Sequence, residues 1–364
     1  MICFLAKRST DYTIRNYVRR YAEGLAKRII LLNYESLSAI QKMECSAVIF
    51  LDIDRLNERE LKQAEALQHF FEENYPDVNL FNKPDQVLLR YDFLKALYQK
   101  GINPHNVYRI RDLPAEINYP VFLREENEHS GTLTSLVWNR KELDVHALGL
   151  HLQGFDRRKL LAVEYVDVSS DSQYLKKYSV TRIGSTFIPR QIDYTTTWQS
   201  KDPNLEAEKS SEYAQDYLSF MNSDQHYDSI KQAFELARIE YGRIDFGFAN
   251  GVPVIWEINL NPDFGPPPYE GELKETLDSM YDRLRSAFSV LADRPTQTID
   301  TEEMLKKLSV DEPAPADDKA QKETLQKKLY GLLRRMPYKN HIISAKRSLY
   351  LFMAQCWIRS GGKI

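Results

Sequence analysis

The sequence predicts a mixed α/β protein with more than one domain, and three observations support this prediction. The chain has 364 residues, which is more than one small domain requires. Over residues 1 to 85, short apolar runs alternate with helical patterns, as expected for a parallel sheet with crossover helices. Two strongly apolar runs between Tyr241 and Pro262 are separated by Asn250-Gly251, which predicts an antiparallel hairpin.

The N-terminal segment predicts a small α/β domain. Its expected strands are Ile2 to Ala6, Ile29 to Leu32, Ala47 to Leu51 and Val78 to Phe81. Apolar residues at helical spacing predict one helix between the first two strands, capped by Thr13 or Asp11, and another between the last two. No glycine-rich turn follows the first strand, so the sequence lacks a dinucleotide-binding fingerprint.

Composition is that of a soluble globular protein, with 43% hydrophobic and 28% charged residues. The three cysteines form no CxxC pattern, which argues against a disulfide framework and a zinc site and favours a reducing, cytoplasmic location. The apolar residues at the start of the chain predict a strand and not a signal peptide. No apolar run reaches the length of a membrane span.

The hairpin carries the residues with the clearest chemistry. Its turn places Asp245 on the first strand across from Glu257 on the second, and Asn259 shares a face with Glu257. Two carboxylates and an amide are hard oxygen ligands that suit one or two Mg²⁺ ions bridging to nucleotide phosphates. The structural alternative is a surface hairpin whose polar side chains face water.

The strings GRIDFGF and WEINLNP resemble the metal-binding end of the ATP-grasp ligases, the group of D-alanine:D-alanine ligase, glutathione synthetase and RimK-type carboxylate-amine ligases. The resemblance covers about residues 1 to 290. It implies an ATP-grasp fold, with an N-terminal α/β domain followed by two α+β lobes that clamp the nucleotide. It also implies that Asp245, Glu257 and Asn259 hold Mg²⁺, or Mn²⁺, on ATP, and that Arg243 steadies the reacting acyl phosphate.

The resemblance places phosphate-binding residues in the central lobe. A predicted helix carries Arg90, and a predicted strand from Pro120 to Leu123 ends at Arg124; family members commonly have lysine at both positions. A small-residue loop, Ser130, Gly131 and Thr132, then leads into a returning strand from Leu133 to Trp138 and corresponds to the glycine-rich phosphate loop. An exposed helix arginine and an ordinary hairpin tip are the alternatives.

The nucleotide base and the reacting anion are assigned by position. After a strand within KLLAVEYVDV, the resemblance places Glu164, Tyr165 and Val166 at the adenine and Asp167 at the ribose, although Asp167 could equally cap a strand end. A further hairpin turns near Gly184-Ser185 and contains Arg182, expected to face a phosphate, a substrate carboxylate or an acidic partner. The polar residues from 193 to 212 could form a lid over the site.

These patterns divide the chain into five predicted parts: an N-terminal α/β domain at 1–85, a central lobe at 86–167, a C-terminal lobe at 168–290, a linker at 291–318 and a basic helical tail at 319–364. From Lys319 onward the only acidic residue is Glu323. The tail could therefore dock on its own enzyme, on a protein partner or on an anionic membrane surface. Nothing besides this charge suggests nucleic acid.

The resulting functional prediction is an ATP-dependent ligase that joins a small-molecule or peptide carboxylate to an amine through an acyl phosphate. A small-molecule kinase with a hydroxyl acceptor, and a nucleotide-binding module without turnover, are the alternatives. Substrate identity and oligomeric state have no readable signature in the sequence.

Overall fold

A computed structural model of the chain describes residues 1–40, 43–129, 131–169, 174–199, 211–223, 227–265, 273–308 and 350–355. The chain forms two compact units. The first combines Met1–Pro104 with Val166–Val310, and the second combines His105–Tyr165 with the chain from Asp311 to Ile364. Parallel and antiparallel sheets both occur, which confirms the predicted mixed α/β class.

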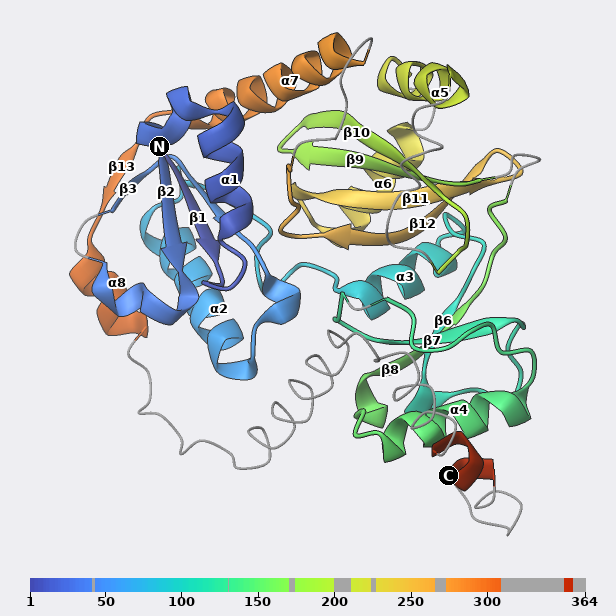
Figure 1. Cartoon of the computed structure of the whole chain (residues 1–364). Helices are drawn as coiled ribbons and strands as arrows, with labels where there is room; N and C mark the ends of the chain where they lie inside the picture. Colours follow the sequence, from blue (N-terminus) through green and yellow to red (C-terminus); the bar gives the residue numbers. More distant parts are fainter. Residues whose placement is uncertain are drawn as a thin grey trace, which may run out of the picture. The chain divides into compact units, whose positions relative to one another are not determined.

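The first unit begins with a parallel four-stranded sheet in the order β2 (Ile29–Asn33), β1 (Ile2–Ala6), β4 (Ala47–Phe50) and β5 (Asn79–Phe81). These strands confirm the four predicted from the apolar runs, and Figure 1 shows β1 and β2 of this sheet side by side. The crossover helices are α1 (Tyr12–Tyr21) and α2 (Glu58–Asn74).

The two helices begin differently. Asp11 precedes α1 but makes no capping hydrogen bond, because its carboxylate accepts from Arg15 and Asn33 instead. The predicted cap by Asp11 is therefore wrong. Helix α2 starts with a capping box in which Asn57 and Glu60 each bind the other's backbone N–H.

The same unit contains an antiparallel four-stranded sheet in the order β10 (Thr186–Thr195), β9 (Leu175–Ile183), β11 (Tyr241–Ala249) and β12 (Val252–Asn259). One face of this sheet packs against α5 (Ser211–Met221) and α6 (Tyr227–Ala237), through ring contacts such as Tyr178–Phe220 and Phe187–Phe234. Gly184, at φ 60°, forms the predicted turn between β9 and β10.

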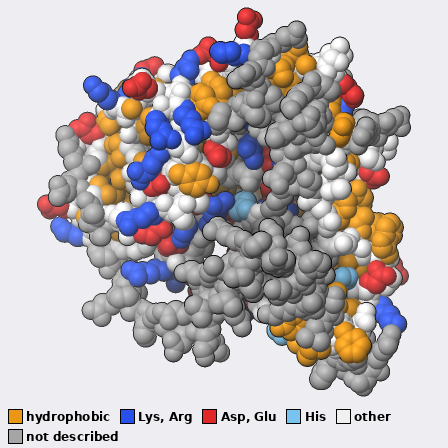
Figure 2. All heavy atoms as spheres, in the orientation of Figure 1, with side chains coloured by type: hydrophobic (Ala, Val, Ile, Leu, Met, Phe, Trp, Pro, Cys, Tyr) orange, Lys and Arg blue, Asp and Glu red, His pale blue; other side chains and the backbone are white. Residues whose placement is uncertain are grey.

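The two sheets of the first unit share one hydrophobic core. Phe4 of β1 packs edge-on against both Tyr241 of β11 and Phe288 of α7 (Lys274–Ala292), with ring centroids 5.9 and 5.8 Å apart. Smaller elements complete the unit: α3 (Arg90–Gln99), the antiparallel pair β3 (Met43–Cys45) and β13 (Gln297–Ile299), and α8 (Thr301–Leu308). Figure 2 shows basic side chains gathered over the N-terminal sheet and α1, where Arg15, Arg19 and Arg20 are exposed.

The second unit contains a three-stranded antiparallel sheet, β6 (Val107–Arg109), β8 (Leu160–Glu164) and β7 (Val121–Glu125), with α4 (Arg140–Leu152). Arg124 lies inside β7 and not at its end. The predicted returning strand from Leu133 to Trp138 is wrong: in this stretch only Val137 forms a bridge, to Val121, and the Leu123 N–H donates to the Thr134 hydroxyl at 3.0 Å.

Several predictions fall outside the described residues, namely Ser130, most of the predicted lid and most of the basic tail. Residues 350–355 of that tail are helical. Among the described residues, no helix combines the length and the apolar character needed to cross a membrane.

Candidate functional site

The hairpin of β11 and β12 has the predicted register. Arg243 lies opposite Asn259, and Asp245 lies opposite Glu257. The turn residues Asn250 and Gly251 have φ angles of 52° and 77°, as a tight primed turn requires. The prediction that Asp245 and Glu257 face each other is confirmed.

Strand β9 adds polar side chains beside this hairpin. Ser179 pairs with Asp245, and Thr181 pairs with Arg243, so alternation along β9 puts Lys177 on the same side. Strand β10 adds Gln191, opposite Ser179, and Asp193, opposite Lys177. We call this set the polar face: Lys177, Ser179, Thr181, Gln191, Asp193, Arg243, Asp245, Glu257 and Asn259.

Charges on the polar face occur as close pairs. Arg243 Nε donates to Asp245 Oδ1 at 3.0 Å, and Asn259 Nδ2 donates to Asp245 Oδ2 at 3.2 Å. Lys177 Nζ lies 2.7 Å from Asp193 Oδ2. Each buried charge thus has a partner that offsets its desolvation.

The pKa directions follow from this burial. Burial raises the pKa of the Asp245 carboxyl, and the charges of Arg243 and Lys177 only partly oppose it. Burial by itself would lower the pKa of Arg243. The charge and hydrogen bond of Asp245 act in the opposite direction, and the pKa of Arg243 is raised. The pKa of Lys177 is raised in the same way, since Asp245 and Asp193 outweigh its burial.

Helix α3 brings Arg90 to the edge of the polar face. Its Nη2 forms a short ion pair with Glu257 Oε2, and the two side chains are 7% and 23% exposed. The residues are separated by 167 positions in the sequence. A group suited to phosphate and a group suited to a cation are therefore in direct contact.

Two hydroxyls on the polar face lack a hydrogen-bond partner among the described residues. Ser179 Oγ and Thr181 Oγ1 are both buried, beside Asp245 and Arg243 in the sheet. Buried polar atoms nearly always have a partner, so unsatisfied hydroxyls indicate a place where a polar ligand can bind.

The residues fit Mg²⁺ on a nucleotide and not a cation cage built by protein alone. Among the described residues, no group of three or more His, Cys, Asp or Glu side chains could hold a metal. The polar face offers the carboxylates of Asp245 and Glu257 and the amide oxygen of Asn259. Mg²⁺ is commonly held by one or two carboxylates, with water and substrate phosphates as its other ligands.

Arg182 lies apart from these residues. It pairs with Gly242, so it projects from the opposite face of the sheet to Arg243 and Thr181. Its Nε and Nη1 donate to the carbonyls of Gly184 and Ile239 at 2.8 and 3.0 Å, and its guanidinium lies over the ring of Phe187. Burial lowers the pKa of Arg182. Its contacts therefore tie the turn between β9 and β10, and the segment between α6 and β11, to the sheet.

In the second unit, Glu164 is buried and its carboxylate is already engaged. Oε2 accepts from the N–H of Asn106 at 2.8 Å, while Oε1 accepts from the Tyr108 hydroxyl at 2.8 Å and the N–H of Asn118 at 3.1 Å. The backbone N–H of Tyr165 donates to the carbonyl of Pro120 at 2.9 Å. These groups stabilise the sheet of the second unit.

The other predicted nucleotide residues are Arg124, Gly131, Thr132, Val166 and Asp167. Arg124 Nη2 donates to the carbonyl of Glu128 at 3.4 Å. Gly131 has a φ of 89°, which favours glycine, and Thr132 follows it at intermediate exposure. Val166 follows β8 outside regular structure, and Asp167 Oδ1 accepts from the N–H of Ser169 at 2.8 Å, the local contact expected of a cap.

Sequence reasoning did not assign Lys177 and Asp193 to the site. Asp193 belongs to β10 and not to an irregular polar segment. The signal was present in β9, where Lys177, Ser179 and Thr181 alternate with Tyr178, Val180 and Arg182. The alternating residues Tyr178, Val180 and Arg182 mark the helix-covered face and leave the first three for the polar face.

No protein-family profile matches the chain, and no curated protein matches its sequence. Solved structures are similar over about four fifths of the chain. D-alanine–D-alanine ligase from Bacillus anthracis, complexed with ATP, is 12% identical with a TM-score of 0.46, over 80% of this chain and 97% of that one. The RimK domain ATP-grasp protein from Sphaerobacter thermophilus is 16% identical with a TM-score of 0.46, over 80% and 98%. VanG D-Ala:D-Ser ligase from Enterococcus faecalis is 12% identical with a TM-score of 0.47, over 79% and 99%.

Proposed function

We propose that this chain is an ATP-dependent carboxylate–amine ligase of the ATP-grasp type, with its reacting centre on the polar face. The observation that carries the proposal is the pairing of Asp245 with Glu257 and of Arg243 with Asn259 on that face. These residues combine three potential cation ligands, Asp245, Glu257 and Asn259, with the positive charge of Arg243. The chemistry of the face thus matches the motifs that resemble the family.

Roles follow from the type and place of each group. Asp245, Glu257 and Asn259 would hold Mg²⁺, which when bound neutralises phosphate charge and orients the transferring group. Arg90 contacts Glu257 and would bind phosphate oxygens. Arg243 is held in place by Asp245, so it offers a preorganised positive charge to an oxyanion.

The proposed reaction needs no side-chain nucleophile. A substrate carboxylate attacks the γ-phosphorus of ATP, releasing ADP and forming an acyl phosphate. An amine then attacks the acyl carbon, the bond from this carbon to the phosphate oxygen breaks, and inorganic phosphate leaves with the proton that the amine loses as the amide forms. Ser179, Thr181 and Asp245 are buried beside Arg243, and this burial would limit the hydrolysis of an acyl phosphate by water.

An ADP-release screen with amino acids, short peptides and hydroxy acids tests this proposal, followed by mass measurement of the product. We expect ADP release that requires both a carboxylate and an amine, and an amide product. Glu257→Gln should lower turnover by at least about 100-fold, since it removes a charged ligand. Glu235→Gln, at an exposed position on α6, is the matched control and should retain wild-type turnover.

Three results would contradict the ligase. A stable phosphate ester formed from a hydroxy acid alone would identify a kinase. ATP binding without ADP release under every condition would identify a binding module. Full activity of Glu257→Gln would remove Glu257 from the metal site.

A further inference from the structure

The carboxyl edge of the parallel sheet has a topological switch point between β1 and β4. From β1 the chain continues to β2 on one side, and β4 then lies on the other side. Open parallel sheets commonly bind ligands at such a point. Here the edge is formed by Lys7–Thr10, which follow β1, and by Asp52, which follows β4.

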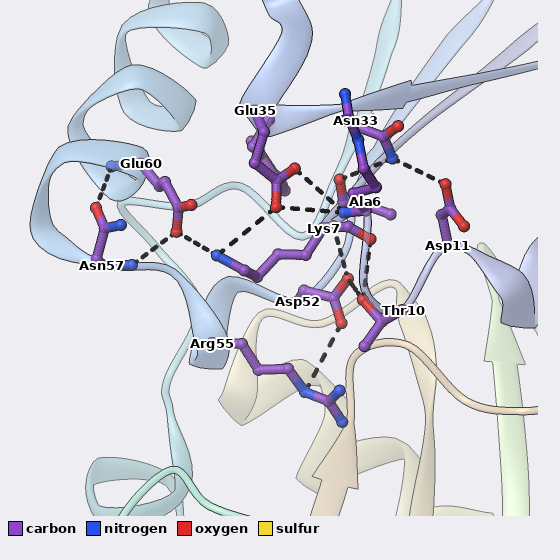
Figure 3. Close-up of polar contacts among 12 residues, drawn as sticks. Ala6, Lys7, Thr10, Asp11, Asn33, Glu35, Asp52, Arg55, Asn57 and Glu60 are labelled. Atoms are coloured by element: carbon purple, nitrogen blue, oxygen red, sulfur yellow. Dashed lines mark hydrogen bonds and ion pairs between the residues drawn. The ribbon is translucent and has the colours of Figure 1, made fainter. Parts of the chain in front are cut away.

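Asp52 is the centre of a polar network at this edge. It is fully buried and has a φ of 55°, a conformation that residues other than glycine adopt at a cost. Its carboxylate accepts from the N–H of Lys7 at 3.0 Å and from the Thr10 hydroxyl at 2.6 Å, and Arg55 Nε lies 3.8 Å away (Figure 3). The buried carboxylate of Asp52 thus has several hydrogen-bond donors around it.

A further donor comes from Asn261, just after the hairpin of β11 and β12. Asn261 Nδ2 lies 3.1 and 3.0 Å from the two carboxylate oxygens of Asp52, and 3.3 Å from the carbonyl of Thr10. Asn261 Oδ1 accepts from the Thr13 hydroxyl at 2.5 Å. Both ends of the amide are therefore used, two residues after the candidate ligand Asn259.

The other end of the hairpin is tied to the same edge. Asn82, which follows β5 with a φ of 57°, accepts from the N–H groups of Glu240 and Tyr241 at 3.0 Å each. Its Nδ2 donates to the carbonyls of Tyr241 and Phe50 at 2.7 and 3.2 Å. Tyr241 opens β11, so the hairpin is fixed to the parallel sheet where it begins and where it ends.

We propose that Asn261 is a positioning residue, which through Asp52 and Thr13 holds the end of β12 so that Glu257 and Asn259 stay aligned with Asp245 and Arg243. The switch point then anchors the hairpin of β11 and β12 and is not a separate ligand pocket. The expected effect on metal binding rests on the proposed function. Residues that orient metal ligands typically change metal affinity by about 10- to 100-fold when altered.

The test is Asn261→Asp, which removes the Nδ2 donor and places a second carboxylate against Asp52. Binding of a non-hydrolysable ATP analogue with Mg²⁺ should weaken at least about tenfold, measured by calorimetry well below the melting temperature. The double variant Asp52→Asn with Asn261→Asp restores a donor and an acceptor and should recover most of the affinity. Asn222→Asp, the same charge change at an exposed position, should bind as wild type.

A milder pair covers the case in which Asn261→Asp fails to fold. Thr13→Val removes only the hydroxyl, which lies 2.5 Å from Asn261 Oδ1 and 3.1 Å from the Thr10 carbonyl oxygen, whereas Thr13→Ser keeps it. We expect weaker Mg²⁺-dependent binding for the valine variant and wild-type binding for the serine variant. Lower melting temperature with unchanged binding in both Asn261→Asp and Thr13→Val would overturn the positioning role and leave a purely structural contact.

Hydrogen exchange separates this inference from the proposed function. If the wild-type chain bound no Mg²⁺ nucleotide, the proposed function would fail, but the anchoring claim would still predict faster amide exchange over residues 257–261 in Asn261→Asp. Unchanged exchange there would contradict the anchor itself, whatever the chain binds.

Discussion

At the scale of single residues, Glu257 and Asp245 each lie against an arginine. Arg90 contacts Glu257, and Arg243 contacts Asp245. The charges within each pair neutralise one another, which lowers the cost of burying them. A cation bound to the carboxylates and a phosphate bound to the arginines would satisfy both sets at once, so the arrangement favours a metal–nucleotide complex over either ion alone.

The contact between Arg90 and Glu257 could not be predicted from the sequence. Alternation and the Asn-Gly turn are enough to align Asp245 with Glu257, because these residues belong to one hairpin. Arg90 reaches Glu257 only after α3 has packed against β12, and no local pattern reports contacts across 167 positions.

Because of His105, we expect the second unit to lose stability as the pH falls. It is 3% exposed, its Nδ1 has no partner among the described residues, and burial lowers the pKa of His105 to about 4 against the raising effect of Glu164. The folded state therefore keeps the ring neutral while the unfolded chain takes up a proton below pH 6.5. The free energy of unfolding should fall by about 3 kcal/mol as the pH drops from 6.5 to about 4, at 1.36 kcal/mol per unit.

Urea denaturation of the wild type and of His105→Gln over this pH range measures the effect. The variant should lack this part of the pH dependence, and His151→Gln, at an exposed position on α4, should keep it. Parallel curves for the wild type and His105→Gln would show that His105 does not carry the acid sensitivity.

At the scale of elements, the hairpin of β11 and β12 combines a predictable turn with an unpredicted irregularity. The register shifts between Asp245 and Phe246, so that Glu257 lies opposite Asp245 while Ile255 lies opposite Phe246. The extra residue is Trp256, whose ring lies so close to Gly247 that a Cβ there would be 2.9 Å away. The apolar pattern of β12 contains no sign of this bulge, because the contact between the Trp256 ring and Gly247 forms across two strands.

The turn itself gives a prediction for Gly251. Its φ of 77° is strained for any residue with a side chain, although a Cβ there would meet nothing within 4 Å. Gly251→Ala should therefore lower the free energy of unfolding by about 1 to 2 kcal/mol through backbone strain alone. Gly24→Ala is the matched control, because Gly24 has equally open space and no positive φ.

Thermal or urea unfolding measures both variants. Gly24→Ala should be neutral or slightly stabilising, since alanine restricts the unfolded chain. Equal effects of the two substitutions would mean that the turn does not hold the conformation on which the register of the hairpin depends.

At the scale of the whole molecule, the sequence predicts the parallel sheet and the two hairpins of the antiparallel sheet, but not how the two sheets are joined. Apolar runs and turn residues define β1, β2, β4, β5 and the hairpin, because these signals are local. The contacts of Asn82 with Tyr241 and of Asn261 with Asp52 join residues 159 and 209 positions apart. They depend on side chains that would otherwise be interpreted as turn residues, so only the folded chain reveals them.

Nucleotide binding with and without Mg²⁺ tests the central claim that the polar face holds a metal–nucleotide complex. Titration calorimetry of the wild-type chain should show ATP binding that weakens at least about tenfold when Mg²⁺ is chelated. Glu257→Gln should bind as weakly with Mg²⁺ as the wild type does without it, whereas Glu235→Gln should match the wild type. Absence of ATP binding, or equal affinity in all four measurements, would contradict the account.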